Sequence, residues 1–421
     1  MVRALIAASL FALCAGANAD APPSKPGSEI AGFDAARLAR IDTFLTAATG
    51  KDGYLGAVAL VARHGQVVEL RAFGHRDLAR HDAMATDSIF RIYSMTKTIT
   101  SIAVLMLMEE GRLGLDDPIS DYLPAFAHMQ VFAGGSADAP QLRPAHTPIT
   151  IKHLLTHTAG FATAAGEEAT RLLERADLHG ARDLADFAQR ASRVPLAVEP
   201  GTRFRYDGTQ LEIASRIVEV VSGQPFDEFL ATRIFAPLGM RDTGFSVPSA
   251  QRHRVVDISA VGADGRLVRA EGPSAREPGA RLNAYSSGAG GLYSTATDYA
   301  RLCWMLLQHG RFEGKSVLGR KTVELMMQNQ LMPLDPPVTE FSPAEGFGLG
   351  GSILLDPARR GRLGSVGQFG WSGAASTYYT IDPREHLVAI LLLQHLPGSG
   401  DHELPKLSTR FYNLVYGALQ P

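Results

Sequence analysis

Residues 88–98 have the sequence Ser-Ile-Phe-Arg-Ile-Tyr-Ser-Met-Thr-Lys-Thr and contain the single Ser-x-x-Lys pattern of the chain, Ser94 to Lys97. The apolar run that follows, up to Gly111, predicts a buried helix that begins near Ser94. Positions three apart share a face of a helix, so the Lys97 amine can reach the Ser94 hydroxyl. A serine becomes an effective nucleophile when a base takes its proton, and the free N–H groups at a helix start add positive partial charge beside it. We therefore expect Ser94 to be a nucleophile and Lys97 its base, with a lysine pKa lowered by burial or a nearby charge.

Strand patterns lie near both ends of the chain. Residues 56–62 and 66–73 flank a His-Gly turn, which predicts a β-hairpin, and further strands are expected in the last part of the chain. Residues 115–280 instead show Pro, Gly and short helical patterns. We predict an α+β fold, in which residues 33–114 and 281–421 form an antiparallel sheet flanked by helices. The segment between them is expected to be an inserted lobe, mainly helical and rich in loops.

Residues 1–19 have the features of a secretory signal peptide. Arg3 is followed by an apolar run and then by the small-residue sequence Ala-Asn-Ala that ends at Ala19. We expect cleavage after Ala19 and a linker rich in Pro, Gly and Ala over residues 20–32. The mature protein is accordingly expected in the periplasm or secreted into the medium.

The composition is that of an ordinary folded protein. The chain has 421 residues, of which 45% are hydrophobic and 20% charged. Lys and Arg number 41 against 43 Asp and Glu, so no overall positive charge favours nucleic acid. Two cysteines, Cys14 and Cys303, are too few for a disulfide framework or a cysteine-based zinc site. After the signal peptide no apolar stretch approaches the roughly 20 residues that a membrane span needs, so we expect none.

Further motifs accompany the Ser-x-x-Lys pattern in a fixed order. They are Glu-Gly-Arg-Leu-Gly-Leu-Asp-Asp-Pro at 110–118, Ile-Lys-His-Leu-Leu-Thr-His-Thr-Ala-Gly at 151–160 and Pro-Gly-Thr-Arg-Phe-Arg-Tyr-Asp-Gly at 200–208. With them, the sequence resembles the serine β-lactamase and penicillin-binding-protein superfamily. Within it, the chain is most similar to the class C β-lactamase-like branch and its family VIII carboxylesterases. The resemblance covers most of residues 35–415 and implies the β-lactamase/DD-peptidase fold.

The resemblance also assigns the proton-transfer residues. The second motif of the branch is Tyr-x-Asn, and Tyr206-Asp-Gly208 stands in its place. By this similarity Tyr206 would share proton transfer with Lys97, and nearby cations would hold the tyrosine pKa below its usual value. Gly208 departs from the asparagine of the branch, so the amide that would hold the side chain of a β-lactam is missing.

The third motif of the superfamily, Lys-Thr-Gly, occurs nowhere in the chain. Trp371-Ser-Gly373 stands in its expected place and resembles the Trp-x-Gly form of family VIII esterases. The resemblance implies that Gly373 lets its strand approach closely, and that the backbone N–H groups of Ala374 and Ser94 form the oxyanion hole. Trp371, Gly373 and Gly208 would then contact the substrate.

Two weaker signals favour a structural interpretation. His153 and His157 have the spacing of a zinc-binding pair, but no glutamate follows His153 and no third ligand is marked. Ser94 is not part of a Gly-x-Ser-x-Gly sequence, so an α/β-hydrolase has no support. We expect no metal and no organic cofactor.

Taken together, these patterns predict an exported serine hydrolase that cleaves small carboxylic esters through an acyl-Ser94 intermediate. The alternatives are a β-lactamase, a D-amino-acid peptidase or an acyltransferase of the same fold. An alternative of another class is a binding or sensing protein without catalysis, although the intact Ser94, Lys97 and Tyr206 argue against it. The sequence does not indicate the number of subunits.

Overall fold

The computed structural model describes residues 29–161 and 166–421. The expected signal peptide and residues 20–28 of the expected linker lie outside these ranges. At the start of the described chain, β1 (Glu29–Ile30) and β2 (Phe33–Asp34) pair with each other. The last residues of the expected linker therefore form a short hairpin.

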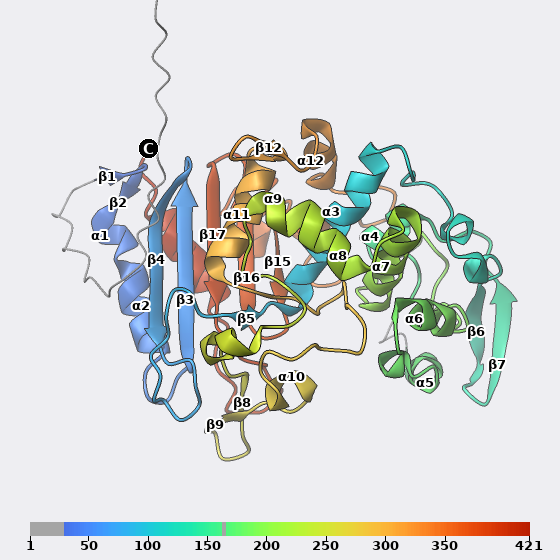
Figure 1. The fold of residues 1–421 in the computed structure, drawn as a ribbon, viewed down its shortest axis with the longest axis horizontal. Coiled ribbons are helices and arrows are strands. Elements are labelled where there is room, and N and C mark those ends of the chain that lie inside the picture. Colours follow the sequence, from blue (N-terminus) through green and yellow to red (C-terminus); the bar gives the residue numbers. More distant parts are fainter. Residues whose placement is uncertain (1–28, 162–165) are drawn as a thin grey trace, which may run out of the picture.

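One seven-stranded antiparallel sheet lies at the centre of the fold. In spatial order, its strands are β13 (Glu345–Phe347), β14 (Ser352–Leu354), β15 (Phe369–Gly373), β16 (Thr377–Asp382), β17 (Leu387–Leu392), β3 (Gly56–Arg63) and β4 (Gln66–Gly74). Figure 1 shows the blue strands β3 and β4 beside the red strand β17, so both ends of the chain build the sheet.

Helices cover the two faces of this sheet. On the outer face lie α1 (Ala35–Leu38), α2 (Arg40–Ala48) and α14 (Ser408–Gly417), and on the inner face α3 (Thr96–Glu109) and α11 (Ala296–Leu307). Every residue of β17 is buried, because this strand has helices on both sides. Phe411 and Leu45 pack on the outer face, whereas Ile390 and Leu302 belong to the inner core.

The helix α3 joins the sheet to the rest of the molecule. All its residues from Thr96 to Leu107 are buried, as expected from a run that is apolar on most sides. It packs against α7 (Thr209–Ser222), which belongs to the expected lobe. The first turn of α3 therefore lies at the junction of the sheet and the lobe.

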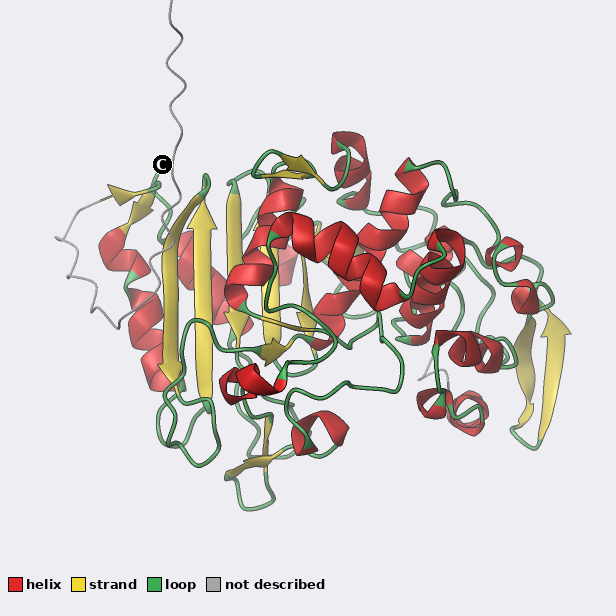
Figure 2. Ribbon diagram, in the orientation of Figure 1, coloured by secondary structure: helices red, strands yellow, loops and turns green. Residues whose placement is uncertain are grey.

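The lobe is mainly helical, but it also contains strands. Its helices include α4 (Ile151–Leu155), α5 (Glu167–Arg175), α6 (Leu184–Ala191), α7 and α8 (Phe226–Leu230). Figure 2 shows a separate two-stranded hairpin at the far end of the molecule, formed by β6 (Gln130–Ser136) and β7 (Ala139–Pro144). This hairpin has no alternating apolar pattern because both its strands are largely exposed.

The remaining elements are short. They are α9 (Ala236–Leu238), α10 (Pro273–Arg276), α12 (Arg320–Met326), α13 (Pro357–Arg360) and the strand pairs β5 (Phe90–Arg91) with β10 (Tyr293–Ser294), β8 (Ser259–Val261) with β9 (Leu267–Arg269) and β11 (Arg311–Phe312) with β12 (Lys315–Ser316). Within residues 29–161 and 166–421, no helix is long and apolar enough to cross a membrane. The predicted α+β class, with an antiparallel sheet and flanking helices, is confirmed.

Candidate active site

Ser94 lies in a single 3-10 turn, Tyr93–Met95, that leads directly into α3. The residue before it, Tyr93, has a φ of +42°, a left-handed conformation that is unusual for a non-glycine residue. Backbone of this kind costs about 1–3 kcal/mol and is held only when the surroundings enforce it. The turn presents Ser94 to a cleft of about 560 Å³ that the residue helps to line. Its hydroxyl is therefore placed at the positive end of a long buried helix.

Lys97 lies one helical turn after Ser94, and its side chain is held by two contacts. Its Nζ donates to Ser94 Oγ at 3.1 Å and to the carbonyl oxygen of Ala289 at 2.7 Å. The residue is 3% exposed, so the amine is shielded from bulk water. The structure thus joins the amine and the hydroxyl in the way that their spacing indicated.

Tyr206 reaches the same place from the segment that precedes α7. Its hydroxyl accepts a hydrogen bond from Trp371 Nε1 at 3.1 Å, and Lys97 Nζ lies 5.0 Å from the centre of its ring. The Glu340 carboxylate fixes the backbone, because it accepts from the Tyr206 N–H at 2.9 Å. The same carboxylate pairs with Arg205 at 2.8 Å. Lys97 is thus a cation that lies against the Tyr206 ring, and Arg205 is engaged by Glu340.

Gly373 ends β15 where this strand passes the residues before Ser94. A Cβ atom at Gly373 would lie 2.3 Å from both the Ile92 carbonyl oxygen and Thr377 Oγ1, so only glycine permits the approach. Ala374 follows directly, and both Ala374 and Ser94 line the cleft. This close approach is the one that the resemblance implies for the glycine of the third motif.

Gly208 caps the start of α7, and nothing in its backbone requires glycine. Its φ is −69°, and an added Cβ would make only an ordinary contact, 3.6 Å from Ala289 Cβ. A side chain could therefore be accommodated here. The glycine at this position is therefore not required by the fold, and it is not among the residues that line the cleft.

Glu212, on the first turn of α7, is a candidate that the sequence patterns did not reveal. It is 5% exposed, and its carboxylate accepts from the Ser287 hydroxyl and from the Gly288 N–H, the latter at 2.9 Å. Burial raises the pKa of Glu212 to about 7, while Ser287 and Lys97 counteract this. Because the adjacent Ala289 carbonyl holds Lys97, Glu212 orders the segment that positions the lysine. A carboxylate on the apolar stripe of α7 was the signal available in the sequence.

The two histidines have separate local roles. His153 Nδ1 accepts from the Thr150 N–H at 3.2 Å and so completes the cap of α4. His157 is fully buried under Tyr206, with ring centres 4.5 Å apart. Burial, followed by the charge of Lys97, holds the pKa of His157 well below its usual value, so this ring is neutral. In the described part of the chain, no group of three or more His, Cys, Asp or Glu side chains could hold a metal ion.

Comparison with known proteins bears on the fold and the family. The Beta-lactamase family model matches residues 41–411. Protein Rv1367c of Mycobacterium tuberculosis is 32% identical over 389 residues, which cover 86% of this chain and 94% of that protein. Esterase EstB of Burkholderia gladioli is 30% identical over 382 residues, covering 86% and 91% of the two chains.

A solved structure agrees with these matches. Unliganded simvastatin synthase from Aspergillus terreus superimposes with a TM-score of 0.76 at 26% identity, covering 90% of this chain and 98% of the other. The predicted β-lactamase/DD-peptidase fold, the resemblance to its esterase branch and the serine hydrolase class are confirmed. The chain belongs to the β-lactamase family.

Proposed function

We propose that this enzyme cleaves small carboxylic esters through an acyl-Ser94 intermediate. The observation that carries the proposal is the buried Lys97 amine, which lies 3.1 Å from the Oγ of Ser94. Ser94 stands at the head of a helix and lines the cleft. A hydroxyl beside a shielded amine can lose its proton as it attacks a carbonyl carbon. The esterase among the relatives supports the ester as substrate.

Acylation would begin when Ser94 Oγ attacks the ester carbonyl. Its proton passes to the Lys97–Tyr206 pair, and the carbonyl oxygen takes the negative charge. The backbone N–H groups of Ser94 and Ala374 would stabilise this oxyanion. The intermediate then collapses, the bond to the alcohol oxygen breaks, and the alcohol leaves with the proton that the pair had taken.

Deacylation would use the same groups in reverse. Tyr206 accepts a proton from a water molecule, which attacks the acyl carbon, and the bond to Ser94 Oγ breaks as the serine regains its proton. The hydrogen bond from Trp371 Nε1 to the Tyr206 oxygen supports this role, because it fixes the position of that oxygen in the site. The products are the carboxylic acid and the free enzyme.

Two positions favour esters over β-lactams. A β-lactam carries a carboxylate that a lysine of the third motif would pair with, and charge-assisted hydrogen bonds are about twice as strong as neutral ones. Trp371 offers an indole ring and one N–H, which already bonds to Tyr206. Gly208 contributes no amide for the side chain of a β-lactam. β-Lactamase or D-amino-acid peptidase activity is therefore the weaker alternative.

Acyl transfer is the second candidate. The relative whose structure superimposes on this chain at 26% identity is named simvastatin synthase, and an acyl-enzyme can be resolved by an alcohol as well as by water. A non-catalytic binding or sensing role agrees less well with the contact between Lys97 and Ser94. A single stoichiometric burst of product without turnover would favour it.

We also propose that the protein is exported. This rests on the signal-like sequence of residues 1–19 alone. N-terminal sequencing of protein recovered from the periplasm or medium should find Asp20 first. An intact chain that begins at Met1 and remains in the cytosol would refute the export proposal.

The test of the proposed activity compares wild type with Ser94→Ala on p-nitrophenyl acyl esters of increasing length and on a chromogenic cephalosporin. We expect ester turnover to fall by about three orders of magnitude or more in the variant, with an unchanged circular dichroism spectrum. Ser316→Ala, at an exposed serine on β12 that does not line the cleft, is the matched control. A fluorophosphonate should label Ser94, and an adduct on another serine would refute the assignment. Faster hydrolysis of the cephalosporin than of short esters would replace the esterase by the lactamase alternative.

A further inference from the structure

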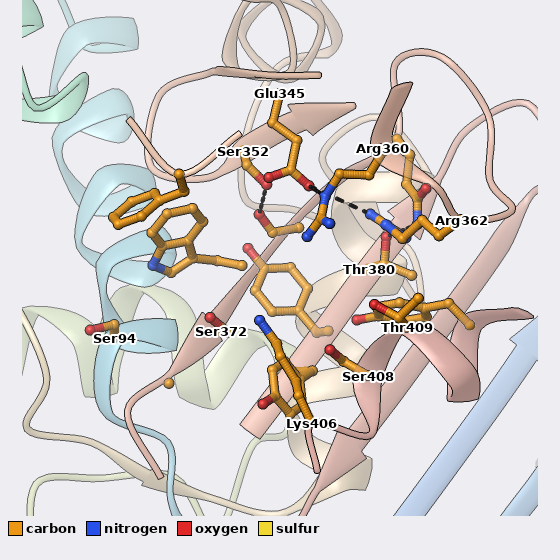
Figure 3. A pocket seen from close by; sticks show the side chains of 18 of the residues that line it. Ser94, Glu345, Ser352, Arg360, Arg362, Ser372, Thr380, Lys406, Ser408 and Thr409 are labelled. Carbon is orange, nitrogen blue, oxygen red and sulfur yellow. Dashed lines mark hydrogen bonds and ion pairs between the residues drawn. The ribbon is translucent and has the colours of Figure 1, made fainter. Parts of the chain in front are cut away.

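The cleft at Ser94 continues past the edge of β15 onto the outer face of the sheet. Among the described residues, β14 pairs only with Phe369 and Gly370 of β15, so Trp371–Gly373 has a free edge on this side. Figure 3 shows Ser94 at one end of the cleft and a group of charged side chains at the other. We name these side chains, Arg360, Arg362, Lys406 and Glu345, the basic pocket.

The basic pocket exists because the outer face is only partly covered. The apolar core under α14 is formed by residues of β3, β4 and β17. The outward positions of β14 and β15 that line the cleft are Ser352, Gly370 and Ser372, and the register places Gly370 opposite both Ser352 and Thr380. An apolar face would have to be covered by a helix. These residues are small or polar, so they stay uncovered and form the floor of a hollow.

The charges in the basic pocket do not balance. Glu345 accepts from Arg360 Nε at 2.8 Å and lies 3.9 Å from Arg362 Nη2. Lys406 forms no ion pair with any residue that the structure describes. Three cations therefore face one carboxylate, which leaves an excess of two positive charges at this end of the cleft.

Polar groups in and beside the basic pocket also lack partners. Arg362 is 11% exposed in its side chain, and its buried Nη1 has no hydrogen-bond acceptor within the described chain. Figure 3 shows the Lys406 amine pointing into the cleft, beside a tyrosine ring. Partial burial of this amine, and next the charge of Arg360, lower the pKa of Lys406. An acidic group bound here would pair with the excess positive charge.

We propose that the basic pocket binds a carboxylate carried by the substrate, so that the enzyme prefers esters with a free acid group remote from the scissile bond. The inference rests on the proposed ester hydrolysis at Ser94, because one continuous cleft joins the two. Its volume of about 560 Å³ is that of a small-molecule site. The indole of Trp371 also lines this cleft and suits the apolar part of such a substrate.

The test uses esters that differ only at the remote end. One series consists of p-nitrophenyl monoesters of dicarboxylic acids of increasing length, and the other of butyrate esters of ω-hydroxy acids. Each compound is paired with the analogue in which a carboxamide replaces the carboxylate. We expect the carboxylate form to be preferred in kcat/KM by about tenfold in at least one series, mainly through KM, since partly buried charge-assisted contacts exceed exposed ones.

The variant that tests the pocket is Lys406→Gln, because Lys406 has an exposed side and is not built into the core. It should lower the carboxylate-to-carboxamide ratio about fivefold, and added salt should lower the ratio in the wild type as well. Lys315→Gln, an exposed lysine on β12 that does not line the cleft, is the matched control and should leave the ratio unchanged. A ratio near one in both series, or a ratio that Lys406→Gln does not change, would overturn the proposal.

A binding measurement separates this proposal from the proposed function. Calorimetry follows glutarate and inorganic phosphate binding to Ser94→Ala protein with and without Lys406→Gln. Glutarate binding that depends on Lys406, together with a wild-type protein that hydrolyses no ester, would refute ester hydrolysis and keep the carboxylate site. Binding of phosphate with the same strength as glutarate would identify a site for free anions and refute carboxylate recognition.

Discussion

On the inner face of β15, Trp371 donates to Tyr206, and Lys97 lies against the same tyrosine ring within a layer of buried side chains. On the outer face of the same strand, Gly370 and Ser372 border a hollow that the basic pocket also lines. The inner side chains are fixed by hydrogen bonds and packing, as groups that move a proton must be. The charges outside are partly exposed and partly unpaired, which suits the recognition of a ligand. The strand β15 thus lies between the residues that we propose carry out the reaction and those that we propose select the substrate.

The largest effect should come from the inner face. We expect Lys97→Ala to reduce kcat for a neutral ester by about 10²–10⁴-fold, the range for removal of a general base. Tyr206→Phe should cost a similar factor, and the double variant should lose little more than either single one, because the two act as one unit. Steady-state kinetics on p-nitrophenyl butyrate measure this. Fully additive losses would mean that Lys97 and Tyr206 act independently. The inner face would then not hold a single proton-transfer unit.

The controls for this series are lysines outside the cleft. Lys321→Ala removes an exposed lysine that pairs with Glu324 at 2.6 Å, so both turnover and its pH profile should stay as in the wild type. If Lys321→Ala slowed the enzyme as much as Lys97→Ala, a loss of general charge or folding would explain both results.

These two faces differ in how far the sequence reveals them. The contact of Ser94 with Lys97 follows from helical periodicity, and both residues lie in one short stretch. Tyr206 and Trp371 are 165 positions apart, and only the resemblance to a family placed them together. The basic pocket gathers residues 345, 360, 362 and 406 from separate segments that carry no motif. Arginine and glutamate are common surface residues, so only the folded chain shows that these converge.

Glu212 illustrates a second reason why sequence reasoning missed part of the site. Its helix has an apolar stripe, and a single acidic residue in such a stripe also occurs at exposed helix edges. Its importance comes from its contacts with Ser287 and Gly288, which lie more than 70 positions later in the chain. The fold of the sheet, in contrast, was predictable because β3, β4 and β17 carry continuous local patterns.

An effect of intermediate size is expected for the Glu212 carboxyl group. Burial raises the pKa of Glu212 from 4.5 to about 7 in the folded protein, so the folded state holds this proton more tightly than the unfolded state. The free energy of unfolding should therefore fall as pH rises from about 4.5 to about 7, by at most about 3 kcal/mol from this group. Urea unfolding at several pH values should show a flatter profile for Glu212→Gln than for the wild type.

The activity of the same variant tests whether the two faces of β15 act independently. Glu212→Gln loses one acceptor for the segment at 287–289, so we expect kcat to fall about tenfold through a displaced Lys97, a positioning effect. Glu212→Asp, which keeps the charge, should restore part of the loss. The carboxylate-to-carboxamide ratio should not move, because Glu212 does not line the cleft. A change in that ratio would show that the two faces are coupled.

The smallest expected change is one of specificity at Trp371, which lies on the inner face and lines the cleft. Trp371→Lys places a cation where lactamases of the superfamily carry one, so kcat/KM should shift toward a cephalosporin relative to a neutral ester, by severalfold. The substitution also removes the donor to Tyr206, 3.1 Å away, and this loss slows both substrates. Trp371→Phe separates the two effects, because it keeps an aromatic ring but has neither the N–H donor nor a cation. Both variants should therefore lose ester turnover, but only Trp371→Lys should change the ratio of cephalosporin to ester. An equal ratio in the two variants would mean that the charge at this position does not select the substrate, and selection would then depend on other residues of the cleft.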